Sequence, residues 1–325
     1  MHPPPGEQGV SFRLASASQK LLFALPLFSC CMLKERADHH GNSAVEHRIF
    51  DGRWRSVFEP ATEAARDNLR NLATRVSEFV YSTPQFQEVF KQRAVHGFVP
   101  DRSVLTHAKT HQTAQTIVQM DIYRAFEFAR RARVITTLDK LGAPAQLQQE
   151  VSGKAFFFDL VPAGFPTSPI LFTTAMLPAD QELMDFAARQ GFVYSRDVDN
   201  LAFSSQRPWI KQTEIDVARE ILKSHGYDTH KVRAEHPTTK RALMCGVGIY
   251  KGRLLIPGKT KRNIQSGLHH ALAEAPDRFV AKTVGLLGRI IQVERRVSGS
   301  LGKYKEAFLT ERYRQRQQRR WKKRK

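Results

Sequence analysis

The chain has 325 residues, with 51 Lys and Arg against 31 Asp and Glu, which gives a formal net charge of +20. This length allows two or three packed subdomains, and 41% hydrophobic with 25% charged residues excludes a fibrous or largely disordered chain. The basic excess favours a polyanionic partner, nucleic acid before membrane, over a merely basic soluble surface.

Cysteine content and apolar runs indicate a cytoplasmic protein without a membrane partner. Three cysteines (Cys30, Cys31 and Cys245) provide neither a disulfide framework nor metal-ligand spacing, and no run of 18 apolar residues predicts a spanning helix. The apolar segment Leu21 to Leu33 resembles a signal-peptide core, but Pro26 interrupts it and no cleavage site is clear. We interpret it as a buried N-terminal helix that follows about 20 poorly ordered residues.

The first predicted elements are a strand and a long helix. Arg53 to Pro60 is predicted to be a short strand that ends at the proline. Ala61 to Phe90 carries apolar residues at helical spacing. A turn-rich loop follows, in which Ser103 can cap a helix that runs to His111. An apolar strand, Ile117 to Ile122, comes next.

Helices and strands then alternate. Ala125 to Leu141 is predicted to be a helix that stops before Gly142, and Phe156 to Leu160 another apolar strand. Two further helices, Ile170 to Arg189 and Thr213 to His225, flank an acidic segment. A later strand pair, Leu243 to Leu255, has Lys251-Gly252 at its turn. This order predicts an α+β fold with an antiparallel core sheet.

The acidic segment carries the strongest functional signal. Tyr194 to Ser204 is predicted to be two strands folded over a tight acidic turn. Acids at the tip of a buried hairpin cost free energy unless a cation neutralises them. Two strands that each deliver a carboxylate, Asp121 and Asp199, can hold a pair of Mg²⁺ ions for nucleotidyl transfer. Taken alone, each Asp is better explained as a turn or strand-end residue. Asp197 shares the face of Asp199 if the strand stays regular, and either adds charge to the site or faces solvent.

Loops and the C-terminal tail supply further candidates. Gly164 to Pro169 is rich in turn residues, and Thr167 and Ser168 can cap the next helix, whose N-terminus favours phosphate. An ordinary capped loop explains the same residues. Arginines suited to phosphate, or simply to solvent, precede the first acid (Arg55, Arg93 and Arg102). The tail, Glu311 to Lys325, has nine Lys or Arg and one acid, which favours nucleic-acid contact over a solvated helix.

An ordered series of motifs resembles the bacterial retron-type reverse transcriptases. Arg55 to Pro60 resembles R-x-I-x-x-P, His96 to Ser103 is similar to G-F-x-x-x-R-S, and His107 to His111 resembles N-A-x-x-H. Val161 to Pro169 is similar to L-P-Q-G-x-P-T-S-P, Tyr194 to Ser204 to Y-T-R-Y-A-D-D-L-T-F-S, and Met244 to Gly246 to V-T-G. The resemblance extends from about Gly52 through most of the chain.

The resemblance implies a right-hand polymerase of α+β class, with fingers, an antiparallel-sheet palm and a helical thumb. We expect an N-terminal extension at 1–45, fingers and the start of the palm at 46–120, the palm at 121–235, a thumb-like region at 236–310 and a basic tail at 311–325. The implied activity is RNA-directed DNA synthesis with two Mg²⁺ ions. The implied partners are a structured non-coding RNA that is both template and primer, its DNA product, dNTPs and an effector protein in anti-phage defence.

Residue roles follow from the same resemblance. Catalytic roles are expected for Asp121, Asp199 and Asn200, and metal contacts for these three and Ile122. Nucleotide-binding roles are expected for Arg55, Arg102, Ala163, Gly164, Phe165 and Pro166. RNA contacts are expected for His107, His111, Cys245, Gly246 and Arg262, and for Arg320, Lys322 and Lys323 of the basic tail. Lys231 or Arg233 stands in for the family's usual lysine after the hairpin.

Several positions depart from the family pattern. Asp197 replaces a tyrosine, Asn200 the second Asp of the acidic pair, and Ala163 a Gln of the nucleotide pocket. His107 replaces the Asn of N-A-x-x-H, and Met244-Cys245 replaces Val-Thr. These changes motivate a second hypothesis, a catalytically weakened scaffold that binds RNA or DNA without substantial synthesis.

Overall fold

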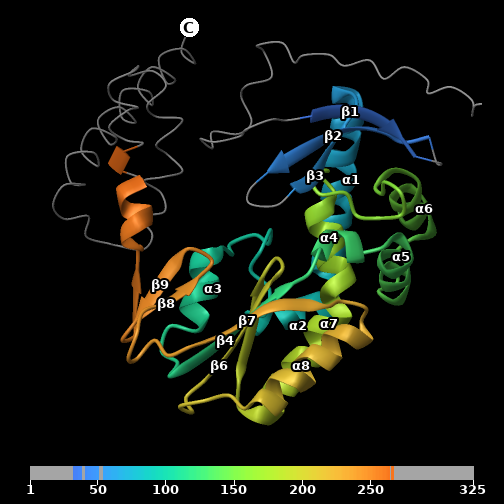
Figure 1. Cartoon of the computed structure of the whole chain (residues 1–325). Coiled ribbons are helices and arrows are strands. Elements are labelled where there is room, and N and C mark those ends of the chain that lie inside the picture. The colour runs from blue at the N-terminus through green and yellow to red at the C-terminus, as the bar shows by residue number, and fades with distance from the viewer. Residues whose placement is uncertain (1–31, 39–40, 51–53, 264, 267–325) are drawn as a thin grey trace, which may run out of the picture. The chain divides into compact units, whose positions relative to one another are not determined.

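The computed structural model describes residues 32–38, 41–50, 54–263 and 265–266 (Figure 1). The chain divides into two compact units. Unit 1 takes in Met1–Phe86 and Arg124–Leu177, and unit 2 takes in Gln87–Tyr123 and Pro178–Lys325. Neither unit is continuous in sequence, so residues far apart along the chain meet within each one.

Unit 1 contains a three-stranded antiparallel sheet, drawn in blue in Figure 1. Its strands are β1 (Met32–Ala37), β2 (Ser43–Phe50) and β3 (Trp54–Pro60), in that spatial order. The strand predicted to end at Pro60 is therefore confirmed. The predicted N-terminal helix falls outside the described residues except for Met32 and Leu33, and those two begin a strand instead.

The helix predicted for residues 61–90 is two helices, α1 (Glu63–Ser82) and α2 (Pro84–Lys91). Thr62 caps α1 by accepting a hydrogen bond from Ala65 N at 3.1 Å. The interruption occurs at Thr83, whose backbone is extended because a residue that precedes proline disfavours the helical region. The predicted apolar stripe of α1 is buried at Leu69, Leu72, Val76 and Val80.

Two predictions for the second half of unit 1 are wrong. The expected helix 125–141 is broken into α4 (Ala125–Phe128) and α5 (Arg131–Lys140), with α6 (Ala145–Lys154) after them. The break lies at Ala129, whose carbonyl accepts a hydrogen bond from Val161 N at 3.2 Å. A contact from a distant segment, which local pattern does not report, therefore ends the first helix.

The apolar run 156–160 is a tight turn and not a strand. Phe157 and Leu160 exchange both backbone hydrogen bonds at 3.1 Å, and the two residues between them have positive φ values of 50° and 60°. Positive φ at both central residues is typical of a type I′ turn. Phe156 and Phe157 are apolar because they are buried, at 0% and 2% exposure, and not because they alternate along a strand.

Unit 2 is built on a four-stranded antiparallel sheet in the order β5-β6-β4-β7. The strands are β4 (Thr116–Ile122), β5 (Val193–Asp197), β6 (Asn200–Ser205) and β7 (Thr229–Glu235). Every neighbouring pair is antiparallel, which confirms the predicted core sheet. The predicted acidic hairpin is also confirmed as β5 and β6, joined by a two-residue turn.

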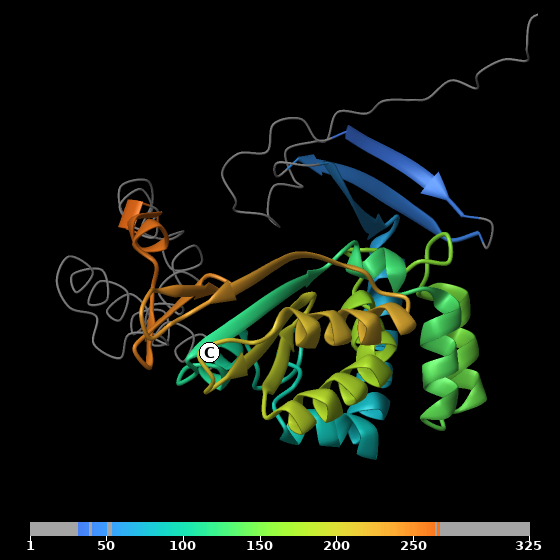
Figure 2. The same ribbon diagram turned by 60° about the horizontal axis from the view of Figure 1, so that its bottom comes forward.

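Different elements cover the two faces of this sheet. On one face, Val118 and Met120 of β4 pack with α8 (Gln212–Ser224) and with the unit 2 part of α7 (Ser168–Gln190). The two helices lie next to each other in both views (Figures 1 and 2). On the other face, Ile117 joins a buried cluster with α3 (Val104–Thr110) and with strands β8 (Ala242–Met244) and β9 (Val247–Tyr250). Side chains that alternate along β4 therefore enter two separate cores.

A second small sheet completes the described part of unit 2, with β8 (Ala242–Met244), β9 (Val247–Tyr250) and β10 (Arg253–Leu255) in the order β10-β9-β8. The predicted turn at Lys251-Gly252 is confirmed, with φ values of 47° and 69°. A second turn of the same kind, at Cys245-Gly246, adds a strand that the sequence did not predict. That turn is central to the site described next.

Candidate active site

Two segments of unit 2 bring acidic residues to one edge of the core sheet. Asp121 lies near the end of β4 and pairs in register with Asn200, the first residue of β6. Val198 and Asp199 form the turn between β5 and β6, and Ile122 N donates a hydrogen bond to Asp199 O at 2.9 Å. Antiparallel pairing therefore places the two predicted metal ligands, Asp121 and Asp199, side by side at the strand ends.

A third acid and a thiol join this edge. Burial and the neighbouring Asp199 raise the pKa of the Asp197 carboxyl. Burial, and then the charges of Asp197, Asp199 and Asp121, raise the pKa of the Cys245 thiol to about 12. The thiol also hydrogen-bonds Asp197, which places the β8–β9 turn against the acidic cluster. Asp199 lies in the turn and not in strand β5. Asp197 and Asp199 therefore do not belong to one regular strand, which was the condition for the two side chains to share a face.

Strand β7 supplies basic groups beside the first acid. His230 Nε2 lies 3.5 Å and Lys231 Nζ 3.7 Å from Asp121 Oδ2. Of the two candidates for the lysine after the hairpin, Lys231 therefore lies close to Asp121. The sequence did not single out His230. His230 lies near Asp121 because β4 and β7 pair in register, and that pairing is known only from the fold.

The histidines of α3 lie behind the hairpin and not on the surface. His107 and His111 are each 1% exposed. Ser195 Oγ of β5 lies 2.8 Å from His107 Nδ1 and 2.7 Å from His111 Nε2, and Ser204 Oγ of β6 lies 2.7 Å from His111 Nδ1. The predicted RNA contact of these rings needs a correction, because buried rings tied to the hairpin present no atom to an RNA. They fasten α3 to both strands of the hairpin.

The loop expected to bind nucleotide lies in unit 1 and packs on its own sheet. Ala163 O accepts a hydrogen bond from Phe58 N at 2.7 Å, and a Cβ on Gly164 would lie 2.4 Å from Phe58 O. Gly164 has a φ of 111°, and the backbone that it approaches closely is that of strand β3. Phe165 is buried and Pro166 partly exposed. A nucleotide role for these residues stays a prediction.

The start of α7 corrects one further expectation. Thr167 and Ser168 were expected to cap this helix with their side chains. Thr167 Oγ1 is buried without a hydrogen-bond partner, and Ser168 Oγ donates to Pro162 O at 2.5 Å. The two hydroxyls therefore do not bind the free N–H groups of the helix, and Ser168 instead closes the preceding loop.

The remaining candidates are placed as follows. Arg102 Nη2 donates to Phe90 O at 2.9 Å, and its guanidinium lies 4.3 Å from the centre of the Phe90 ring. Arg262 is exposed in the helical turns that follow Pro257. The side chain of Arg55 and all of Arg320, Lys322 and Lys323 lie outside the described residues. Gly246 forms the β8–β9 turn with Cys245.

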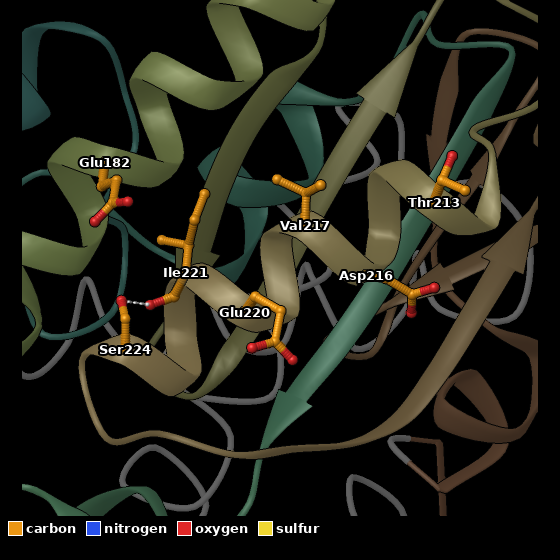
Figure 3. A pocket seen from close by; sticks show the side chains of 7 residues that line it. All are labelled: Glu182, Thr213, Asp216, Val217, Glu220, Ile221 and Ser224. Carbon is orange, nitrogen blue, oxygen red and sulfur yellow. Dashed lines mark hydrogen bonds between the residues drawn. The ribbon is translucent and has the colours of Figure 1, made fainter.

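A separate hollow of about 490 Å³ lies on the outer side of α7 and α8 (Figure 3). Three carboxylates (Glu182, Asp216 and Glu220) surround the apolar side chains of Val217 and Ile221. Arg219 lies 3.7 Å from Asp216 and Lys223 lies 3.8 Å from Glu220, so basic partners already balance part of this charge. None of the acids at the sheet edge lines this hollow, and it is not part of the candidate site.

The sheet edge provides a donor set that suits a divalent cation. Asp121 and Asp199 supply carboxylates, Asn200 an amide oxygen, and the buried Ile122 its backbone carbonyl. Asn200 Nδ2 donates to Asp199 Oδ1 at 3.0 Å, which leaves the amide oxygen available. Among the residues that the structure describes, no three His, Cys, Asp or Glu side chains form a complete metal cage. Mg²⁺ in nucleotide sites takes one or two carboxylates plus substrate phosphates and water, so the open pair of carboxylates fits it.

Comparison with known proteins agrees with the motifs. The family model described as reverse transcriptase (RNA-dependent DNA polymerase) matches residues 59–244, more than half of the chain. The retron Mx162 and Mx65 reverse transcriptases of Myxococcus xanthus are 27% and 28% identical over 75% and 61% of this chain. The retron Ec86 reverse transcriptase of Escherichia coli is 23% identical over 70% of this chain and 68% of its own length. The chain spans about half the length of the two M. xanthus relatives, 55% and 48%.

The family match accounts for the motif series and for the antiparallel sheet with its flanking helices. Together with the retron relatives, it also confirms the predicted retron-type resemblance. The chain belongs to the reverse transcriptase (RNA-dependent DNA polymerase) family.

Proposed function

We propose that this protein is an RNA-directed DNA polymerase of retron type that copies a structured non-coding RNA into single-stranded DNA. The observation that carries the proposal is the meeting of Asp121 and Asp199, from separate segments, at one edge of the core sheet. Family membership and the names of the curated relatives support it.

The chemistry proposed for this edge is nucleotidyl transfer. Two divalent ions, when bound, lower the pKa of the attacking hydroxyl and neutralise the triphosphate oxygens. Asp121, Asp199, the Asn200 amide and the Ile122 carbonyl would hold them. Asn200 carries no charge, so the pair at the turn contributes one negative charge where two aspartates would contribute two. Lys231, 3.7 Å from Asp121, adds a cation beside the triphosphate position.

The proposed partners are polyanions. A net charge of +20 favours polyanionic partners. On the resemblance we propose that the partner is an RNA template that also serves as primer, together with its DNA product, held largely through the backbone. We assign contacts of this kind to Arg262 and to the basic tail, and dNTP contacts to Arg55, Arg102 and the loop that contains Gly164. The division into fingers, palm, thumb and tail belongs to the same proposal.

The cellular setting is proposed on the resemblance alone: a bacterial cytoplasm, an effector protein and anti-phage defence. In the part of the chain that the structure describes, no helix is both long and apolar enough to cross a membrane.

One observation favours a second candidate, a scaffold that binds nucleic acid with little synthesis. The acidic turn has Asn200 in place of its second Asp, which reduces the negative charge available to cations.

The experiment that separates the two candidates uses the protein purified with its co-expressed RNA. The nucleic acid is extracted, treated with RNase and then DNase, and examined on a denaturing gel. A discrete DNA band that disappears in Asp199→Asn supports the polymerase. Bound RNA without DNA, even after dNTPs and Mg²⁺ are added, supports the scaffold.

A further inference from the structure

We propose that Gly97 and Arg196 are positioning residues that fix the β5–β6 turn, and thereby the place of Asp199 at the acidic edge. This inference rests on the proposed function, because it concerns how the polymerase site is held in shape. Neither residue was assigned a role by its motif.

Gly97 leaves room for the turn itself. A Cβ at this position would lie 2.4 Å from both Val198 N and Val198 Cγ2, a distance that real Cβ atoms essentially never show. Gly97 has no positive φ, so its backbone conformation does not require glycine. Contact with the turn is therefore the feature that excludes a side chain here.

The loop that contains Gly97 is fastened to the strand that leads into the turn. Arg196 N donates to Ala94 O at 2.7 Å, and His96 N donates to Arg196 O at 2.9 Å. These two bonds join the loop and β5 in a short parallel bridge. Gly97, the next residue, is consequently held against Val198 by backbone bonds and not by its own packing alone.

The side chain of Arg196 reaches the same turn from the buried side. It is 0% exposed and pairs with the equally buried Asp180 of α7 through Nε and Nη2, both at 2.7 Å. Its third nitrogen, Nη1, donates to Val198 O at 3.1 Å. Tyr194 OH donates to the same Asp180 carboxylate at 2.8 Å, which holds the acceptor in place. The buried pair thus presents a fixed donor to the turn.

Together these contacts restrain the peptide groups on both sides of Asp199. Arg196 binds the carbonyl of Val198, and Ile122 N binds the carbonyl of Asp199 at 2.9 Å. Val198 has a φ of 57°, which is unfavourable for a β-branched residue, so the turn needs such restraint to keep its shape. Catalytic groups lose much of their effect when displaced by about an ångström.

The test compares Gly97→Ala with Gly153→Ala, a helical glycine of unit 1 whose added Cβ meets nothing within 4 Å. DNA synthesis is measured on the co-purified RNA. Binding of Mn²⁺ is followed by loss of the free-ion electron paramagnetic resonance signal, and RNA binding and melting temperature report the fold. We expect Gly97→Ala to lower synthesis about ten- to a hundredfold and to weaken Mn²⁺ binding, with RNA binding retained. Gly153→Ala should match the wild type. Unchanged synthesis and unchanged Mn²⁺ binding in Gly97→Ala would overturn the inference.

Two further variants keep the test decisive if Gly97→Ala folds poorly. Arg196→Lys keeps a positive charge for Asp180 but removes the donor to Val198 O, and it should weaken Mn²⁺ binding in the same direction. Adding Val198→Ala to Gly97→Ala should not restore synthesis, because Val198 N remains 2.4 Å from the new Cβ. Wild-type Mn²⁺ binding in folded Arg196→Lys would contradict the proposed restraint, and full recovery in the double variant would contradict the part assigned to Val198 N.

Asp199→Asn, measured in parallel, separates this inference from the function on which it rests. If Asp199→Asn retains synthesis, the site assignment itself fails. If Asp199→Asn abolishes synthesis and Gly97→Ala leaves both synthesis and Mn²⁺ binding intact, only the positioning role fails.

Discussion

Gly164 in unit 1 and Gly97 in unit 2 are both pressed against a neighbouring backbone, yet the two contacts have different consequences. A Cβ on Gly164 would lie 2.4 Å from Phe58 O, in the middle of a regular sheet strand. A Cβ on Gly97 would lie at the same distance from Val198 N, one residue before Asp199. The absence of a side chain therefore allows close packing against a sheet strand in unit 1 and against a candidate catalytic turn in unit 2.

The difference shows that a glycine inside a family motif does not by itself mark a ligand site. What each glycine touches decides the outcome of its substitution. Gly164→Ala should lower the stability of unit 1, whereas Gly97→Ala should act mainly on the geometry of the acidic edge. The predictions below test whether these two effects separate.

The largest effect is expected at the two acids of the unit 2 sheet edge. Asp121→Asn or Asp199→Asn should abolish DNA synthesis, a loss of at least about a hundredfold, because each removes a carboxylate that would neutralise cation charge. RNA binding should persist. Asp216→Asn, at an exposed acid on α8, is the matched control and should leave synthesis unchanged. Unaltered synthesis in both active-site variants would remove the site assignment.

Next in size is the effect of Gly164→Ala on unit 1. The variant forces a side chain onto a φ of 111° and into the Phe58 carbonyl, which should cost about 2–4 kcal/mol of the free energy of unfolding. Urea denaturation measures the change. Gly153→Ala, which lies in α6, should be neutral or stabilising by up to about 1 kcal/mol. An unfolding midpoint for Gly164→Ala equal to that of the wild type would show that β3 shifts to accommodate the new side chain without a loss of stability.

A smaller effect concerns the histidines behind the hairpin. Burial lowers the pKa of His111 to about 3 and that of His107 well below its usual value. In the unfolded chain such rings titrate near 6.5, so below about pH 6.5 the unfolded state binds more protons than the folded state. The stability provided by the neutral rings is therefore complete above about pH 6.5 and is lost as the pH falls toward 3.

Replacing one of these rings should weaken that pH dependence. His107→Asn restores the residue of the family motif and removes one titrating group, so urea midpoints between pH 4 and 6.5 should fall less steeply than in the wild type. An identical slope in the two proteins would mean that the His107 ring is not held neutral in the folded state.

The smallest change is expected from Asn200→Asp. This variant restores the second acid of the family's turn, so synthesis should stay at the wild-type level or rise a few-fold if Asp199 is already well placed. Steady-state incorporation of dNTPs is sufficient to measure it. A collapse of synthesis would indicate that the turn uses a different set of ligands.

Local pattern predicted those parts of the fold whose signals are local. The β5–β6 hairpin, the Ser103 cap of α3 and the Lys251-Gly252 turn each depend on a few adjacent residues, and all three are present. The predicted helix 125–141 failed because Ala129 is bound by Val161, and the predicted strand 156–160 failed because a tight turn at Phe158 and Asp159 reverses the chain.

The residues of the candidate site also divide into those that local pattern predicts and those that depend on distant contacts. Asp121 could be identified because it ends an apolar run, and Asp199 because it lies in the acidic turn of a hairpin motif. The Arg196–Asp180 pair and the closeness of His230 to Asp121 could not be predicted, because each depends on which elements meet in the fold. His107 and His111 were predicted to contact RNA because a motif gives order and spacing but not burial.

The most direct test of the account is to locate divalent ions at the acidic edge. Crystals of the protein with its RNA, a primer end and a non-reactive dNTP would be soaked in Mn²⁺ and measured at the manganese absorption edge. We predict anomalous density within about 2.2 Å of a carboxylate oxygen of both Asp121 and Asp199, and its loss in Asp199→Asn. Mn²⁺ bound away from these two residues, for example only at Glu182 and Asp216 on α7 and α8, would contradict the account.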